Sequence, residues 1–167
     1  MGTKKIIYFL VIIIILFSLD LYSQFREMTL EEKVNKSDLI VIGEVLCIDV
    51  KWEDGRSSIG TYVTVSIEEC INGSNNLENI TIKMPGGFIE EEGIGLAFTG
   101  WTNPAFKEKE KVFLFLRSIS DEEYYAVVNS AYGKYMIFDD NKVLHTNYFK
   151  EEFVDKIKAI MALEEKK

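Results

Sequence analysis

The feature that most constrains this 167-residue chain is a series of short β-type segments separated by turn-forming residues. Residues 61–71, TYVTVSIEECI, alternate between apolar and polar side chains, as a strand with one buried face does. Residues 39–52, LIVIGEVLCIDVKW, are rich in β-branched residues, and Gly43 within them predicts a bend or bulge. The intervening residues 53–58 have turn chemistry. Two long strands joined by a turn are therefore expected.

The remaining segments extend this pattern. Pro85 is expected to end a strand at 79–84, because proline has no N–H for a ladder. Residues 85–111 show no clear period and are expected to form a long connection, whereas 112–117, VFLFLR, indicate a buried strand. Further strands are expected at 124–129, 133–138 and, after a turn at 139–141, at 142–145.

A helix is expected at each end of the strand series. Thr29-Leu30-Glu31-Glu32 is a capping-box pattern, which predicts a short helix that ends near residues 37–38. Apolar residues recur at helical spacing near the C-terminus and predict an amphipathic helix over residues 149–164. They are Phe149, Phe153, Ile157, Ile160 and Met161. The fold class is therefore mainly β, a small barrel or sandwich of five to six strands with these two helices.

The first residues have the pattern of an export signal. Lys4 and Lys5 precede an apolar run at 6–17, whose roughly twelve residues suit a signal peptide and fall short of a membrane span. Cleavage after Ser23 is expected, and an uncleaved anchor is the alternative. The expected organisation is a signal peptide at 1–23, a barrel domain at 24–148 and a C-terminal helix at 149–167. The protein is expected to be secreted, periplasmic or in the cell envelope.

The chain is acidic, with a net charge of −8 and a pI near 4.8. Binding to nucleic acid depends on lysine and arginine neutralising phosphates, so this class of partner is not expected. An anionic membrane surface would repel the body of the protein, so membrane contact is expected only through an uncleaved leader.

Cys47 and Cys70 are the only cysteines. Export permits a disulfide. However, the hairpin pairing that the turn suggests places Cys47 opposite Ser66, about 13 Å from Cys70 at the rise of a strand. Two small buried hydrophobic residues are therefore favoured over a disulfide.

The stretch MPGGFIEEEGIG at residues 84–95 resembles neither of the ion sites that its composition suggests. A phosphate loop needs Gly-Lys-Ser/Thr before a helix, and adjacent carboxylates would repel phosphate. Three consecutive glutamates in an extended chain leave at most Glu90 and Glu92 on one side, which makes a weak calcium site a lesser alternative to a solvated charge run.

Catalytic patterns are missing from the sequence. His145 is the only histidine, so a histidine triad for zinc cannot form, and no Gly-x-Ser-x-Gly motif supports a nucleophile. A hydrolase that uses paired carboxylates remains an alternative on composition alone. The expectation is a protein that is not an enzyme and binds no cofactor or metal.

The long connection is the expected place for function, because loops of this length are unusual in compact domains. Its aromatic residues either fill the barrel end or anchor a partner. The predicted partner-binding residues are Pro85, Gly86, Gly87, Phe88, Phe98, Trp101 and Phe106.

Three segments resemble a group of exported prokaryotic proteins of unknown function: Pro85-Gly86-Gly87, VFLFL at 112–116 after a charged lead-in, and YGKY at 132–135. The resemblance spans residues 29–138. It implies an OB-like, Greek-key barrel similar to netrin-like domains and tissue inhibitors of metalloproteinases, in a group sometimes associated with matrixin-type metalloproteases. No cysteine lies near Gln24, so the zinc-chelating mechanism of the inhibitors does not carry over, and Lys109 stands where the group usually has glycine.

The expected function is that of an exported, non-enzymatic protein-interaction domain. Its partner would be a secreted or envelope protein, with a metalloprotease as one candidate, bound through residues 86–106. The alternative is a small-ligand or glycan-binding barrel, in which Trp52, Tyr62 and Trp101 stack on sugar rings.

Overall fold

The computed structural model describes residues 26–74, 76–91, 94–99, 102–120 and 122–164. The predicted leader and Trp101 lie outside the described residues. Within the described ranges, no helix has the length and apolar character needed to cross a membrane. The helices are α2 (Leu30–Asn35), the 3₁₀ helix η1 (Ser130–Gly133) and α3 (Lys150–Glu164), and the strands are β1 (Leu39–Glu53), β2 (Ser58–Asn72), β3 (Asn79–Glu91), β4 (Ile94–Thr99), β5 (Lys111–Ser118), β6 (Tyr125–Val127) and β7 (Lys134–Met136).

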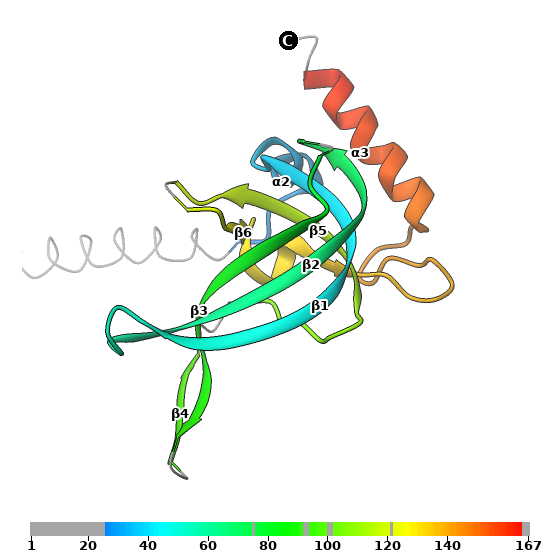
Figure 1. Ribbon diagram of the computed structural model, residues 1–167. Helices are drawn as coiled ribbons and strands as arrows, with labels where there is room; N and C mark the ends of the chain where they lie inside the picture. The colour runs from blue at the N-terminus through cyan, green and yellow to red at the C-terminus, as the bar shows by residue number, and fades with distance from the viewer. Residues whose placement is uncertain (1–25, 75, 92–93, 100–101, 121, 165–167) are drawn as a thin grey trace, which may run out of the picture.

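The chain is mainly β and forms a closed five-stranded barrel (Figure 1). The strand order is β1-β2-β3-β6-β5, and β1 also pairs with β5, which closes the barrel. The β3–β6 pair is parallel, whereas the neighbouring pairs are antiparallel. The expected OB-like barrel is thus confirmed. Two further strands lie outside it, β4 on β3 and β7 on β5.

Bulges in β1 bend this long strand around the barrel. The register with β2 shifts at Ile42/Gly43, which confirms the bend expected at Gly43. A Cβ atom there would lie 2.2 Å from the Ser66 carbonyl oxygen, so only glycine fits. Another shift lies between Val45 and Cys47. The register that starts at the turn pairs Trp52 with Ile59 and Cys47 with Thr64, so the expected pairing of Cys47 with Ser66 is wrong. Both cysteines are free thiols, half-buried rather than buried.

Two apolar cores lie on opposite faces of β1 and β5. Alternate residues of β5, Val112, Leu114 and Leu116, point into the barrel and pack against β1, β2 and β3. The intervening Phe113 and Phe115 pack under α2 and α3. The rings of Phe113 and Phe153 meet edge to face, with 5.0 Å between their centroids. The central five residues of β5 are therefore buried on both faces, as the apolar run predicts.

The two helices confirm their sequence signals. In α2 the Thr29 hydroxyl accepts a hydrogen bond from the Glu32 amide, and the Glu32 carboxylate accepts one from the Thr29 amide. Phe149 precedes α3 and is exposed. The strand expected at 142–145 is wrong, because only isolated bridges form there. Strands β6 and β7 have three residues each and are shorter than predicted.

Candidate functional site

Residues Pro85, Gly86 and Gly87 form a joint at which β3 changes its partner. The ladder with β2 ends at the pair Gly60–Pro85, and the ladder with β4 begins at Gly86–Thr99. Because Pro85 lies at this change, its missing N–H costs no ladder hydrogen bond. The expectation that Pro85 ends the strand is therefore wrong. Gly86 and Gly87 have φ angles of 91° and 153°, which favour glycine.

Beyond the joint, β3 and β4 form a two-stranded ribbon that extends away from the barrel, here called the arm (Figure 1). The long connection expected at 85–111 is thus largely a hairpin followed by a shorter loop at 102–110. The arm exposes large apolar side chains: Phe88 is 58% exposed, Ile94 65% and Leu96 45%. The Phe88 ring lies over Gly95, where an added Cβ atom would lie only 2.9 Å from it.

The arm is tied to the β1–β2 hairpin by the carboxylate of Glu91. The Trp52 indole N–H donates to this carboxylate at 3.0 Å, and the Arg56 guanidinium lies 3.3 Å from it. A cleft of about 240 Å³ lies between the hairpin and the arm, with Trp52 and Ile59 on one side and Leu96 on the other. A two-stranded ribbon alone is marginally stable, so these contacts fix the arm in place.

The loop at 102–110 crosses one end of the barrel and is held by a buried ion pair. The Lys134 ammonium lies 2.7 and 2.8 Å from the two carboxylate oxygens of Glu110, and both side chains are less than a tenth exposed. Lys134 also donates to the Ala105 carbonyl and lies 4.7 Å from the centroid of the Phe106 ring. The pair thereby holds the Phe106 ring in place at this end of the barrel.

Two hydrogen bonds to backbone carbonyls also hold this loop in position, one from the Asn103 side chain and one from the Lys109 backbone. The Asn103 amide donates to the Pro85 carbonyl at 2.6 Å, and the Lys109 N–H donates to the Val45 carbonyl at 2.8 Å. Lys109 has a φ of 63°, a left-handed conformation that glycine adopts more readily. The backbone at this position therefore suits glycine better than lysine.

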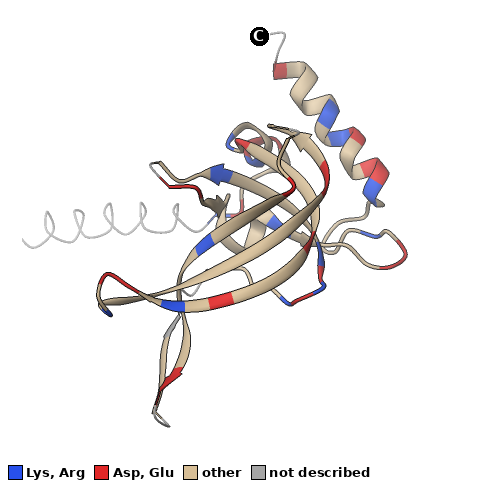
Figure 2. Ribbon diagram, viewed as in Figure 1, with Lys and Arg blue, Asp and Glu red and all other residues tan. Residues whose placement is uncertain are grey.

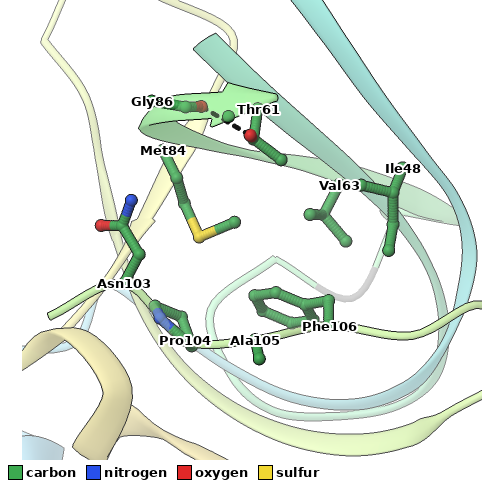
Figure 3. A pocket seen from close by; sticks show the side chains of 10 residues that line it. Ile48, Thr61, Val63, Met84, Gly86, Asn103, Pro104, Ala105 and Phe106 are labelled. Carbon is green, nitrogen blue, oxygen red and sulfur yellow. Dashed lines mark hydrogen bonds between the residues drawn. The ribbon is translucent and has the colours of Figure 1, made fainter. Parts of the chain in front are cut away.

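A cavity of about 250 Å³ lies between this loop and the parts of β1, β2 and β3 that carry Ile48, Val63 and Met84. In Figure 3, Met84, Val63 and Ile48 point from the strands toward Phe106, which rises from the loop. The Thr61 hydroxyl, on the same wall, donates to the Gly86 carbonyl at 2.6 Å. The remaining lining residues are Gly86, Gly87, Asn103, Pro104 and Ala105.

A second polar cluster lies on the outer face of β2 and β3. The Tyr62 hydroxyl donates to Glu53, and this hydrogen bond lowers the pKa of the Glu53 carboxyl. Burial, together with the Glu53 carboxylate, raises the pKa of Tyr62 to about 12. The hydrogen bond to Glu122 raises the pKa of Lys83 to about 12. Lys51 lies 3.9 Å from the Tyr62 ring centroid, so this ring is covered and only 8% exposed.

The structure divides the predicted partner-binding residues into two sets. Pro85, Gly86, Gly87 and Phe106 meet at the joint and the barrel end, whereas Phe88 lies on the arm. Phe98 belongs to β4, but its side chain lies outside the described residues, as does the whole of Trp101. Trp52 and Tyr62 lie within β1 and β2, not in loops.

Sequence reasoning missed the residues that hold the site together, namely Lys134, Glu110 and the Trp52–Glu91 pair. No local signal marks them, because Pro85–Gly87, the lead-in to β5 and Lys134 are separated in the sequence and meet only at this end of the barrel. His145 is exposed, precedes α3, and lines neither the cavity nor the cleft. In the described part of the chain, no three His, Cys, Asp or Glu side chains gather as metal ligands would.

Comparison of the chain with models of protein families, with curated proteins and with solved structures finds no match.

Proposed function

We propose that the protein is an exported, non-enzymatic interaction domain that binds an extended segment of another secreted or envelope protein along β4. The observation that carries this proposal is the arm, an uncharged apolar edge strand that projects from the barrel. Strand β4 reads IGLAFT and has no charged residue, as Figure 2 shows. Among the described residues it pairs only with β3.

Exposed edges of this kind are normally protected. Native proteins place lysine, proline or a bulge on an edge strand, because an unprotected edge pairs with other chains. In addition, large apolar side chains grouped on a surface mark a binding site. Ile94 and Leu96 form such a group on one face of the arm, and Phe88 is exposed on the opposite face. Burial of each on binding contributes about 1.5–3 kcal/mol.

The surroundings of the arm define the chemistry of the partner segment. A strand added to β4 forms main-chain hydrogen bonds, and its alternate side chains face the arm surface beside the cleft at Trp52 and Leu96. The cleft accepts an apolar side chain. The net charge of −8 favours a segment flanked by lysine or arginine. A secreted metalloprotease is one class of protein that can present such a segment.

A photo-crosslinking residue at position 96, in the full chain exported by its host, tests the proposal and identifies the partner by mass spectrometry. The affinity for that partner is then measured for Leu96→Lys, which adds a protective charge to the edge, and is expected to fall by about tenfold or more. Leu163→Lys is the matched control, since Leu163 is 64% exposed on α3 at the other end of the molecule (Figure 1). Equal binding by both variants, or crosslinks only to a second copy of this chain, would refute the proposal.

A further inference from the structure

The cavity at the barrel end has properties that a space left by imperfect packing does not share. Its walls come from three strands and a separate loop, and the apolar side chains of Ile48, Val63, Met84 and Phe106 converge on it (Figure 3). The cavity is open to solvent, and its volume of about 250 Å³ exceeds the roughly 150 Å³ of a closed apolar cavity that binds benzene. The space is therefore large enough for a fused two-ring molecule.

Two side-chain donors on the wall are already engaged within the protein. The Thr61 hydroxyl donates to the Gly86 carbonyl, and the Asn103 amide donates to the Pro85 carbonyl. None of the described residues that line the cavity is charged. A water molecule needs two to four hydrogen-bond partners, so water against the apolar wall of this open cavity is held weakly and is readily displaced. A charged ligand would lose its hydration without gaining a counterion.

The cavity is also formed before any ligand arrives. The Lys134–Glu110 pair and the Asn103 side-chain amide hold the loop at 102–110, and the Lys134 ammonium lies 4.7 Å from the centroid of the Phe106 ring. A wall that is already ordered does not have to be immobilised on binding, which lowers the cost of binding.

We propose that this cavity is a binding site for a small, uncharged, flat apolar molecule of one or two aromatic rings. Such a ligand contacts Ile48, Val63 and Met84 on one side and the Phe106 ring on the other. Met84 adapts its shape to a ring and makes favourable sulfur–aromatic contacts. This site uses residues other than the exposed surface of the arm, and it stands whether or not the arm binds a protein.

The methionines supply the test within one molecule. Met84 lines the cavity, whereas Met28, Met136 and Met161 lie elsewhere. The full chain labelled with ¹³C at the methionine methyl groups is titrated with indole and with toluene, and in parallel with benzoate. We expect a saturable shift of the Met84 resonance with indole and toluene, and none with benzoate. The resonances of Met28, Met136 and Met161 are expected to stay unchanged.

Variants on one strand then locate the binding. Ile48→Trp places a larger side chain in the cavity. It is expected to raise the indole concentration that gives half of the Met84 shift by about tenfold. Leu46→Trp is the matched control, because Leu46 is 49% exposed outside the cavity, and its titration is expected to equal that of the wild type. Unperturbed resonances of Met28 and Met161 in both variants show that the fold is intact.

Three results would overturn the proposal: no Met84 shift at saturating indole, an equal response to benzoate, or equal titrations of Ile48→Trp and Leu46→Trp. If Ile48→Trp fails to fold, the comparison of indole with benzoate on the wild-type chain decides alone.

Discussion

Replacement of Lys134 by methionine tests how the barrel end is built. The Lys134 and Glu110 side chains are 9% and 7% exposed, and their charged atoms lie 2.7 Å apart. Methionine preserves much of the length and apolar stem of lysine. It leaves the Glu110 carboxylate buried with the Lys107 amide as its remaining described donor, at 3.1 Å. It also removes the ammonium from beside Phe106 and from the Ala105 carbonyl.

The magnitude follows from this burial. Breaking a buried ion pair by removing one partner costs about 3–5 kcal/mol, because a charge is left without a counterion. Since Glu110 retains one hydrogen bond and lies at the barrel end, we expect about 3 kcal/mol for Lys134→Met. For a chain of this size that corresponds to a fall in Tm of about 6–12 °C.

A double-mutant cycle isolates the pair from other effects of the substitutions. Urea unfolding is measured for Lys134→Met, Glu110→Gln and the double variant, with an expected coupling free energy of about 2 kcal/mol. Lys142→Met is the control, since the Lys142–Asp140 pair is exposed and is expected to contribute less than about 0.5 kcal/mol. A coupling no larger than that control effect would refute the reasoning, because it would show that the pair is solvated like a surface pair.

Three further changes test other parts of the fold. Phe153→Ala is expected to lower the free energy of unfolding by about 3–5 kcal/mol in urea, since the Phe153 ring is 2% exposed and meets the Phe113, Phe115 and Tyr135 rings; a loss below about 1 kcal/mol would contradict this packing. Lys109→Gly is expected to raise that free energy by about 0.5 kcal/mol because it relieves a left-handed backbone, whereas Lys107→Gly as control is expected to lower it. Tyr62→Phe is expected to flatten the loss of stability between about pH 10 and pH 12. The folded state keeps the Tyr62 proton up to a pKa of about 12, whereas the unfolded chain loses it at a pKa of 10.0. Between these values the unfolded state binds fewer protons, so a rise in pH favours unfolding and the protein loses stability. Urea midpoints across this pH range measure the difference, and parallel curves for both proteins would contradict it.

Local sequence signals predicted most of the helices and strands. The register between strands depends on pairing over longer distances, and it was not predicted correctly. The capping box at Thr29, the turn after β1 and the apolar run of β5 act within a few residues, so their chemistry is readable from the chain. The partner of Cys47 depends on the hairpin register at the turn, where Glu53 pairs with Ser58 and Trp52 with Ile59. The residue types of the turn do not fix this register, and it places Cys47 opposite Thr64 rather than Ser66.

The candidate site shows the same limit at Pro85. Proline correctly predicts an interruption of the β2–β3 ladder, which does end at that residue. The strand continues because a second partner, β4, takes over at Gly86. The sequence also indicated that residues 86–106 hold the most unusual surface, but the arm and the cavity separate only once the strands are paired in space. The Lys134–Glu110 pair joins residues 24 positions apart and has no local pattern.

The joint at Pro85–Gly87 has a consequence for how this protein can change over evolutionary time. Side chains of β3 before the joint, such as Ile82, are fully buried in the barrel, whereas Phe88 after it is mostly exposed. Substitutions in the arm therefore carry little penalty for folding, and substitutions in the barrel carry a large one. A single strand thus combines a segment in which most substitutions reduce stability with a segment whose exposed positions can change at little cost to folding.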